Sequence, residues 1–492
     1  MNSKAPNLRL VVNSSRTTPL KTFAGVYLIT DQQDNLIERV RLAIRGGVSV
    51  LQYRPKDKPF EQSLNEGNAL KRICAERGVL FIVNDDISLA HELRADGVHL
   101  GQDDGTVAQA REILGQHSII GISTHNRGEA LKAEAEGADY LGFGAMYPTG
   151  SKEITHMPGT SGLASIRDHV KLPIVAIGGI SPSNACRVID SGADAVAVIS
   201  SVLSSPRPDI AAAELRLLFN RTHQFPRGAV ITVAGSDSGG GAGIQGDIKT
   251  VTLLGSYAAS AITALPAQNT RGVKSIHGIP PSFVRDQLDT VLSDLPIDVI
   301  KTGMLHTPAI ISTLAEYLSE QSRLIPLVID PVMVAKGGAA LLELDAINIF
   351  IDELLPHAYL LTPNLPEAER LLNCRIHNEP EMEMAARRLH EMGAANVLIK
   401  GGHLSGNDST DILFDGKTIH RFTSERIFSS STHGTGCSSA SAISAYLAQG
   451  EPLKDAVKKA KEFITAAIRL ARPMSKGHGP VNHYLAAKEM EK

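Results

Sequence analysis

Short apolar segments alternate with helix-like stretches through the first part of this chain. Between residues 25 and 200 these segments, rich in β-branched residues, read GVYLIT, VSVLQYR, LFIVND, GVHLG, IIGIST, YLGFGAMY, PIVAIGG and AVAVIS. Nearly continuous apolar strands separated by helices are typical of βα units in a parallel sheet. About eight such units favour a closed (β/α)8 TIM barrel over an open sheet. We therefore predict an α/β protein that begins with a barrel.

A second α/β series follows a change in pattern. The chain has 492 residues, more than one hydrophobic core usually organises, so two domains are expected. From residue 229 the apolar segments VITVAG, IDVIKTG, PLVIDPV, AYLLTPN, NVLIKGG and DILFDG appear, and helices follow residue 436. Prolines 206, 208 and 226 flank a short Ala/Leu-rich helix between the series. We predict a flexible extension at 1–22, a barrel at 23–203, a linker at 204–228 and a second domain at 229–492.

Charge and cysteine content restrict the partners. A formal net charge of −3 gives no general attraction to nucleic acid or anionic membrane, so small-molecule substrates are expected. No apolar run approaches the roughly 18 residues of a membrane span. Four cysteines without paired spacing argue against structural zinc and disulfides, which fits a reducing cytoplasm. The basic, Ser/Thr-containing residues 1–22 leave an organelle transit peptide as the alternative to a flexible extension.

Polar residues cluster where the predicted barrel strands end, the position of active sites in this fold. They are Gln52, Arg54, Lys56, Asn84, Asp85, Gln102, Asp103, Asp104, Ser123, Thr149, Ser151, Lys152, Gly178 and Gly179. Two carboxylates on neighbouring strand ends suit Mg²⁺, which prefers oxygen ligands and shares them with phosphate. Glycines after the seventh strand let backbone N–H groups approach a phosphate. Taken singly, Asp85 or Asp104 could equally be a helix cap.

These segments resemble thiamine-phosphate synthase over almost the whole first half. The matching pieces are YLITD, QYRPK, VNDD, GVHLGQDD, IGISTHN, PTGSK and AIGGI. The resemblance implies that Asp85 and Asp104 hold Mg²⁺, that Lys152 is catalytic, and that diphosphate leaves before the thiazole nitrogen attacks. It assigns the pyrimidine diphosphate to Gln52, Arg54, Lys56, Asn84, Ser123 and Lys152, and the thiazole phosphate to Thr149, Ser151, Gly179, Ile199 and Ser200. We expect His99 and His125 to be packing or hydrogen-bonding residues.

The second half carries a different phosphate-site pattern. Gly241-x-Gly243-x-x-Gly246 matches a dinucleotide fingerprint only formally, because no acid lies between Asp247 and Asp286. The segment STHGTGC, by contrast, places a glycine turn directly before a helix of small residues. Backbone N–H groups from Gly434 to Cys437 would form an anion hole there, and the helix N-terminus should favour the thiolate of Cys437.

This half resembles the hydroxymethylpyrimidine (phosphate) kinase branch of the ribokinase-like superfamily, from residue 229 to 485. The matching pieces are AGSDSGGGAGIQGDIKT, ITALPAQNTRGV, IKTGML, VIDPVM, LTPNLPEAERLL, IKGGH and THGTGC. The resemblance implies a three-layer α/β/α domain that uses ATP and Mg²⁺, with Cys437 activating the acceptor beside Gly434 and Gly436. It assigns the pyrimidine pocket to Gly235, Asp247, Gln268, Met304 and Val332, the nucleotide phosphates to Lys400, and Mg²⁺, through water, to Asn364 and Glu367. Asn364 and Glu367 could instead be an ordinary polar helix start.

Together the two resemblances predict a bifunctional transferase of thiamine biosynthesis. The kinase would make the pyrimidine diphosphate that the barrel consumes. Two alternatives stay open: a non-catalytic barrel serving as scaffold or sensor, and a kinase that prefers pyridoxal. A homodimer through the second domain is a further expectation.

Overall fold

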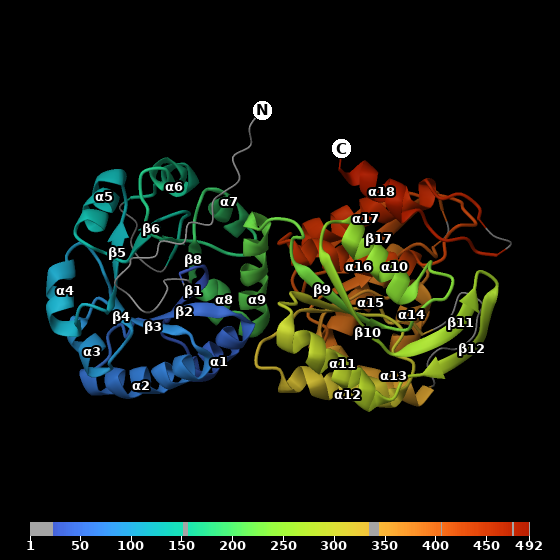
Figure 1. Ribbon diagram of the computed structural model, residues 1–492, viewed down its shortest axis with the longest axis horizontal. Coiled ribbons are helices and arrows are strands. Elements are labelled where there is room, and N and C mark those ends of the chain that lie inside the picture. Colours follow the sequence, from blue (N-terminus) through green and yellow to red (C-terminus); the bar gives the residue numbers. More distant parts are fainter. Residues whose placement is uncertain (1–22, 151–155, 334–343, 405, 475–476, 492) are drawn as a thin grey trace. The chain divides into compact units, whose positions relative to one another are not determined.

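The computed structural model describes residues 23–150, 156–333, 344–404, 406–474 and 477–491. The chain divides into two compact units, Met1–Phe219 and Asn220–Lys492. Figure 1 shows strands and helices alternating along both. Each unit is described by itself.

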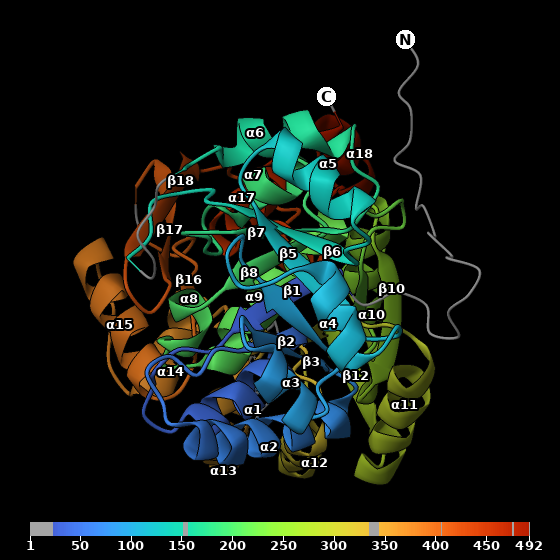
Figure 2. The same ribbon diagram turned by 90° about the vertical axis from the view of Figure 1, so that its left-hand side faces the viewer.

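The first unit contains a closed barrel of parallel strands (Figure 2). Its strands are β1 (Gly25–Ile29), β2 (Val48–Tyr53), β3 (Leu80–Asn84), β4 (Gly97–Leu100), β5 (Ile119–Thr124), β6 (Tyr140–Gly144), β7 (Ile174–Ile177) and β8 (Ala195–Val198). Each pairs with the next, and β8 pairs with β1 to close the ring. The barrel predicted from eight apolar segments is therefore confirmed.

Helices cover the outside of the barrel. They are α1 (Leu36–Gly46), α2 (Phe60–Arg77), α3 (Ile87–Glu92), α4 (Val107–Leu114), α5 (Arg127–Ala135), α6 (Gly159–Arg167), α7 (Ala185–Asp190), α8 (Ser200–Leu203) and α9 (Pro208–Leu218). Because neighbouring strand residues point to opposite faces, the apolar residues form two cores. On β1, Val26 and Leu28 belong to the core under the helices, whereas Tyr27 and Ile29 belong to the barrel interior.

The predicted linker requires a correction. Residues 204–228 include α9, which packs against α1 of the barrel. A Cβ at Gly46 on α1 would clash with the backbone carbonyl of Asp209, so the two helices are in close contact. Prolines at both ends of the segment reflect a helix start at Pro208 and a turn near Pro226, and the barrel unit extends to Phe219.

An eight-stranded sheet organises the second unit, in the order β10-β9-β13-β14-β15-β16-β17-β18. The strands are β9 (Ala229–Ala234), β10 (Tyr257–Ile262), β13 (Val299–Thr302), β14 (Leu327–Ile329), β15 (Ala358–Leu361), β16 (Val397–Ile399), β17 (Asp408–Phe414) and β18 (Ile419–Glu425). The first six in sheet order run parallel and the last two antiparallel. A separate hairpin is formed by β11 (Ala264–Asn269) and β12 (Gly272–Gly278).

Helices lie on both faces of this sheet, giving the three layers that were predicted. They include α10 (Gly243–Leu253), α11 (Pro281–Asp294), α12 (Pro308–Glu320), α14 (Leu365–Leu372), α15 (Glu379–Glu391), α16 (Thr435–Ala448), α17 (Leu453–Arg469) and α18 (His483–Met490). On β9, Ile231 and Val233 pack in the core that contains α11 and α12. Thr232 between them faces the other way and bonds to Asp247 of α10. No helix in the described part of the chain is long and apolar enough to cross a membrane.

Candidate active sites

The two acidic residues at the barrel rim do not cap helices. Asp86 caps α3 by accepting from the Leu89 N–H, and Thr106 caps α4 in a capping box with Gln109. Asp85 and Asp104 each precede these caps and are exposed, which leaves their carboxylates at the rim. Asp85 adopts a left-handed conformation with φ of 62°, uncommon for a residue other than glycine and enriched at functional sites.

Asp85 and Asp104 line one cavity of about 550 Å³, whose other walls come from α3, α4 and the loops that precede them. The Asp85 carboxylate accepts from the Asn84 amide at 2.5 Å, and Asp104 accepts from the Gly101 N–H at 2.9 Å. No group of three or more His, Cys, Asp or Glu side chains that could hold a metal ion occurs among the described residues. Two carboxylates fit Mg²⁺, which keeps several waters and takes phosphate oxygens as further ligands. A closed all-protein metal site is not what these residues build.

Three side chains at the end of β2 are equipped to bind an anion. Gln52 is only 2% exposed, and its Nε2 has no hydrogen-bond partner among the described residues. An unsatisfied buried donor is costly, so this N–H₂ group is well placed to donate to a ligand. No ion pair occupies the side chains of Arg54 and Lys56 within the described part of the chain. Both cations are therefore available at the rim.

The glycine turn after β7 provides the second predicted binding region. Gly178 and Gly179 have φ of 102° and 63°, and a Cβ at Gly179 would clash with the backbone of Tyr147 and Pro148. Ile199 caps α8 and Ser200 begins it, so backbone N–H groups lie near the same strand ends. Thr149 follows β6. Ser151 and Lys152, also predicted here, lie outside the described residues.

A cavity of about 360 Å³ in the second unit collects nearly all the residues predicted for the kinase site. Its walls include Gly235, Gln268, Met304, Val332, Asn364, Glu367, Lys400, Gly434, Gly436 and Cys437. They come from strand ends far apart in sequence and from the starts of α10, α14 and α16. Clefts at the carboxyl ends of parallel strands are the usual ligand sites of such sheets.

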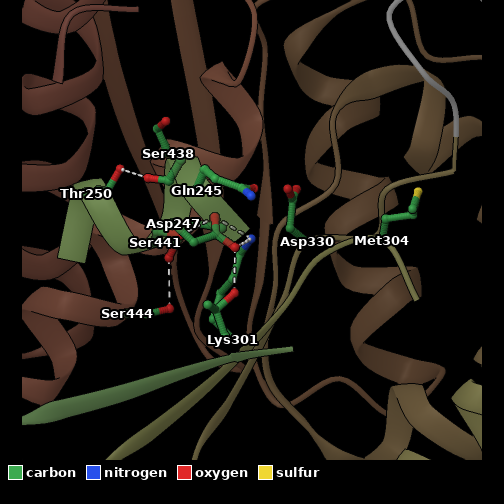
Figure 3. Close-up of polar contacts among 12 residues, drawn as sticks. Gln245, Asp247, Thr250, Lys301, Met304, Asp330, Ser438, Ser441 and Ser444 are labelled. Atoms are coloured by element: carbon green, nitrogen blue, oxygen red, sulfur yellow. Dashed lines mark hydrogen bonds and ion pairs between the residues drawn. The ribbon is translucent and has the colours of Figure 1, made fainter. Parts of the chain in front are cut away.

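Asp247 is the exception, because its side chain does not line this cavity. It is fully buried and lies within 2.9 Å of the Lys301 ammonium through both carboxylate oxygens. Ser441 of α16 and Thr232 of β9 also donate to it. Figure 3 shows Asp247 pointing to Lys301 and Ser441. Three donor groups make four hydrogen bonds to this carboxylate, because Asp247 points from α10 toward the sheet and not into the cavity.

The N-termini of two helices meet at the cavity. Gly434 precedes α16 with φ of 82°, and a Cβ there would clash with the carbonyl of Gly241, before α10. N–H groups in the first turn of α16, including those of Gly436 and Cys437, have no acceptor within the helix. This arrangement suits an anion.

The surroundings of Cys437 oppose the thiolate character predicted for it. Burial raises the pKa of Cys437 to about 12, the Lys301 ammonium acts in the opposite direction, and the Asp330 and Asp247 carboxylates add to the rise. The helix N-terminus does not outweigh burial between two acids. These surroundings therefore favour the thiol over the thiolate when no ligand is bound.

Lys400 lies beside two acidic residues of the cavity wall, Asp330 and Glu367. Its Nζ lies 2.9 Å from Asp330 Oδ1. Burial disfavours the charged form of Lys400, yet Asp330 and Glu367 raise its pKa above the ordinary value. Burial raises the pKa of Glu367 to about 7 against the lowering effect of Lys400. Asn364 and Glu367 also form a capping box at the start of α14, with both bonds at 2.9 Å, so the structural alternative for this pair holds as well.

Sequence reasoning missed three residues of this cavity. Asp330 is 2% exposed and follows β14 directly, a strand-end position that would have identified it. Asp237 accepts from the Gly239, Gly241 and Ala242 N–H groups and lies 2.9 Å from His433 Nε2. Burial raises the pKa of Asp237, whereas the hydrogen bonds from His433 and from the loop lower it. The net effect is a pKa below the ordinary value. No sequence spacing indicated that residues 237 and 433 would meet.

Comparisons with known proteins agree with the division of the chain into two units that each have their own site. A family model described as thiamine monophosphate synthase matches residues 26–202, and one described as phosphomethylpyrimidine kinase matches residues 237–482. A thiamine biosynthesis bifunctional protein of Geobacter sulfurreducens is 58% identical and covers 100% of this chain and 99% of its own length. A hydroxymethylpyrimidine/phosphomethylpyrimidine kinase of Haemophilus influenzae is 47% identical over 52% of this chain and 96% of its own length. The solved structure of a pyridoxal kinase from Staphylococcus aureus in complex with ADP is 38% identical, with a TM-score of 0.49, over 52% of this chain and 93% of that one.

Proposed function

Because the chain belongs to the family of bifunctional thiamine biosynthesis proteins, we propose that its two units catalyse consecutive reactions. The second unit phosphorylates hydroxymethylpyrimidine and then its monophosphate with ATP. The first unit joins the resulting diphosphate to thiazole phosphate, releasing diphosphate and giving thiamine phosphate. The 58% sequence identity over the full chain is the observation that carries this proposal.

In the barrel, the side chains around β2 to β5 bind and neutralise the leaving diphosphate. Arg54 and Lys56 supply unpaired positive charge, and Gln52 supplies a buried donor without a partner in the described part of the chain. Mg²⁺ held by Asp85 and Asp104 would add charge neutralisation at the same oxygens. Gly179, Thr149, Ser151, Ile199 and Ser200 hold the thiazole phosphate, with Lys152 at the reacting centre. No strong base is required, since positioned charge does the catalytic work.

In the second unit, Lys400 and the first turn of α16 bind the phosphoryl group being transferred. Asn364 and Glu367 are the groups that would organise Mg²⁺ through water, and Glu367 has a buried carboxylate at the cavity wall. Gly235, Gln268, Met304 and Val332 line the place for the pyrimidine. Cys437 stands beside Gly436 at the helix start, where its thiolate form would take the proton of the acceptor hydroxyl.

The catalytic interpretation of the barrel is favoured over a scaffold. A scaffold has no use for a left-handed Asp85, a buried Gln52 amide and two cations on one rim, the last three without partners among the described residues. A buried donor without a partner and a left-handed aspartate cost stability, and they persist where a ligand uses them. We also infer a cytoplasmic location, since no disulfide joins the four cysteines in the described part of the chain and a reducing compartment suits thiols.

The purified protein tests the proposal directly. With ATP, Mg²⁺, hydroxymethylpyrimidine and thiazole phosphate it should form thiamine phosphate, detected by mass spectrometry. Omitting thiazole phosphate should leave pyrimidine diphosphate instead. Formation of neither product would contradict the proposal. A parallel assay with pyridoxal decides the remaining alternative: kcat/KM for pyridoxal above that for the pyrimidine would reassign the kinase.

A further inference from the structure

A chain of hydrogen bonds crosses the interior of the barrel from β1 to the rim. The hydroxyls of Tyr27 and Tyr140 lie 2.8 Å apart, and the Tyr140 hydroxyl lies 2.9 Å from His99 Nδ1. On the other side of the ring, His99 Nε2 lies 2.9 Å from Ser123 Oγ. Ser123 is one of the residues proposed to contact the pyrimidine diphosphate. This chain of hydrogen bonds therefore ends at the proposed diphosphate site.

Both tyrosines are neutral hydroxyl donors. Tyr27 is 2% exposed and Tyr140 is fully buried. Burial raises the pKa of Tyr27 and of Tyr140 well above the ordinary value. Each O–H proton must therefore be donated to an acceptor, because an unsatisfied buried donor costs about 1–3 kcal/mol.

This requirement fixes the direction of every bond in the chain. Among the described residues the Tyr27 side chain bonds only to Tyr140, so its O–H donates to the Tyr140 oxygen. Tyr140 then donates to the acceptor that remains, His99 Nδ1. With Nδ1 accepting, the ring proton lies on Nε2 and is donated to Ser123 Oγ.

The direction of these bonds determines what Ser123 offers a ligand. Its oxygen already accepts from His99, and its side chain has no other hydrogen-bond partner in the described part of the chain. The Ser123 proton is thus available for an acceptor at the barrel mouth. An anionic phosphate oxygen is such an acceptor.

Two glycines make room for this chain. A Cβ at Gly142 of β6 would lie 2.8 Å from His99 Cε1, and a Cβ at Gly121 of β5 would overlap the Tyr140 ring. Glycine in a strand interior weakens the strand and marks a close approach. The strand sequence thus accommodates His99 and Tyr140 at the expense of local packing.

We propose that Tyr140, supported by Tyr27, is a positioning residue for the barrel reaction. It holds the proton of His99 on Nε2, so that the Ser123 hydroxyl donates to an oxygen of the pyrimidine diphosphate. This inference rests on the proposed function of the first unit and on the contact proposed for Ser123.

The kinetic test uses Tyr140→Phe in the full chain, with pyrimidine diphosphate and thiazole phosphate supplied. The ring stays and the hydroxyl is lost, so kcat/KM for condensation should fall about tenfold or more, the order of one hydrogen bond to a charged group. In a Ser123→Ala background the same substitution should have less than a twofold effect. Tyr53→Phe is the matched control, because Tyr53 is equally buried but bonds to Glu66 of α2. It should leave condensation unchanged, and hydrogen exchange of peptides from the barrel strands reports whether the first unit is folded in each variant.

The unmodified protein provides a test that no folding defect can obscure. ¹⁵N-histidine NMR, with His99→Gln for assignment, should show the proton of His99 on Nε2, and Tyr140→Phe should shift this equilibrium toward Nδ1–H. A proton on Nδ1 in the unmodified protein would overturn the proposal. So would a loss in Ser123→Ala that Tyr140→Phe does not share, or full additivity of the two. If Ser123→Ala itself has no effect, the contact proposed for Ser123 is wrong, and so is the positioning role of Tyr140. If the unmodified protein does not condense the two substrates, the proposed function of the first unit is wrong.

Discussion

Cys437 illustrates how a residue's surroundings can reverse the chemistry that its local sequence suggests. A cysteine in the first turn of a helix ordinarily ionises easily. Here burial, with Asp330 and Asp247 nearby, raises its pKa to about 12 despite Lys301. Only the packed structure brings these carboxylates to the sulfur, since they come from α10 and β14. The identity of the residue was predictable from THGTGC, but its protonation state was not.

This environment predicts a steep pH dependence of the kinase. Below a pKa of about 12 the thiolate fraction rises tenfold per pH unit, so kcat/KM should rise close to tenfold per unit between pH 7 and 9 if Cys437 acts as the base. Cys437→Asp should make kcat/KM nearly independent of pH over this range, because an aspartate is already ionised. Steady-state kinetics across this range provide the measurement. Cys374→Ser, outside the cavity, is the control, and a flat profile in the unmodified protein would contradict the role of Cys437 as base.

At the scale of elements, the buried pair of Asp247 and Lys301 joins α10 to β13. Ser441 of α16 and Thr232 of β9 complete its hydrogen bonds, so four elements meet at one carboxylate. Both side chains are fully buried. A buried ion pair contributes little to net stability, but loss of one partner leaves an uncompensated charge.

Asp247→Asn should therefore destabilise the second unit by about 3–5 kcal/mol. Urea denaturation, with hydrogen exchange of peptides from α10 and α16, measures the effect. Replacing both partners with apolar residues, as in Asp247→Leu with Lys301→Met, should cost less than the single change. Asp286→Asn makes the same substitution at an exposed site on α11 and should be nearly neutral. A neutral Asp247→Asn would show that the pair does not join these elements.

Elements with strong apolar runs were predictable from the sequence, and weakly patterned ones were not. All eight barrel strands and six of the strands in the second sheet coincide with the segments that were identified. The strands β10 (YAASAI) and β18 (IHRFTSE) lie at the two edges of the sheet, where small or polar residues suffice, and they gave no comparable signal. The hairpin of β11 and β12 likewise has many exposed residues. The C-terminal extent of the barrel unit was misjudged because prolines around α9 suggested a linker.

In the molecule as a whole, the two proposed sites have no residue in common. The product of the site in the second unit is the substrate of the site in the first. Asp85 and Asp104 line a cavity of the first unit, and Cys437 lines a cavity of the second. Each unit has its own hydrophobic core. The functions of the individual site residues and the homodimer stay predictions. Separate cores and separate sites imply that each activity can be removed without the other.

The most direct measurement follows both half-reactions in two single variants, Asp85→Asn and Cys437→Ala. Asp85→Asn should lower condensation of supplied pyrimidine diphosphate by about a hundredfold or more and leave the kinase within twofold. Cys437→Ala should lower the kinase by about 10²–10⁴-fold and leave condensation within twofold. An equimolar mixture of the two variants should again convert hydroxymethylpyrimidine to thiamine phosphate. Loss of both activities in either folded variant, or a mixture that stays inactive, would contradict the account.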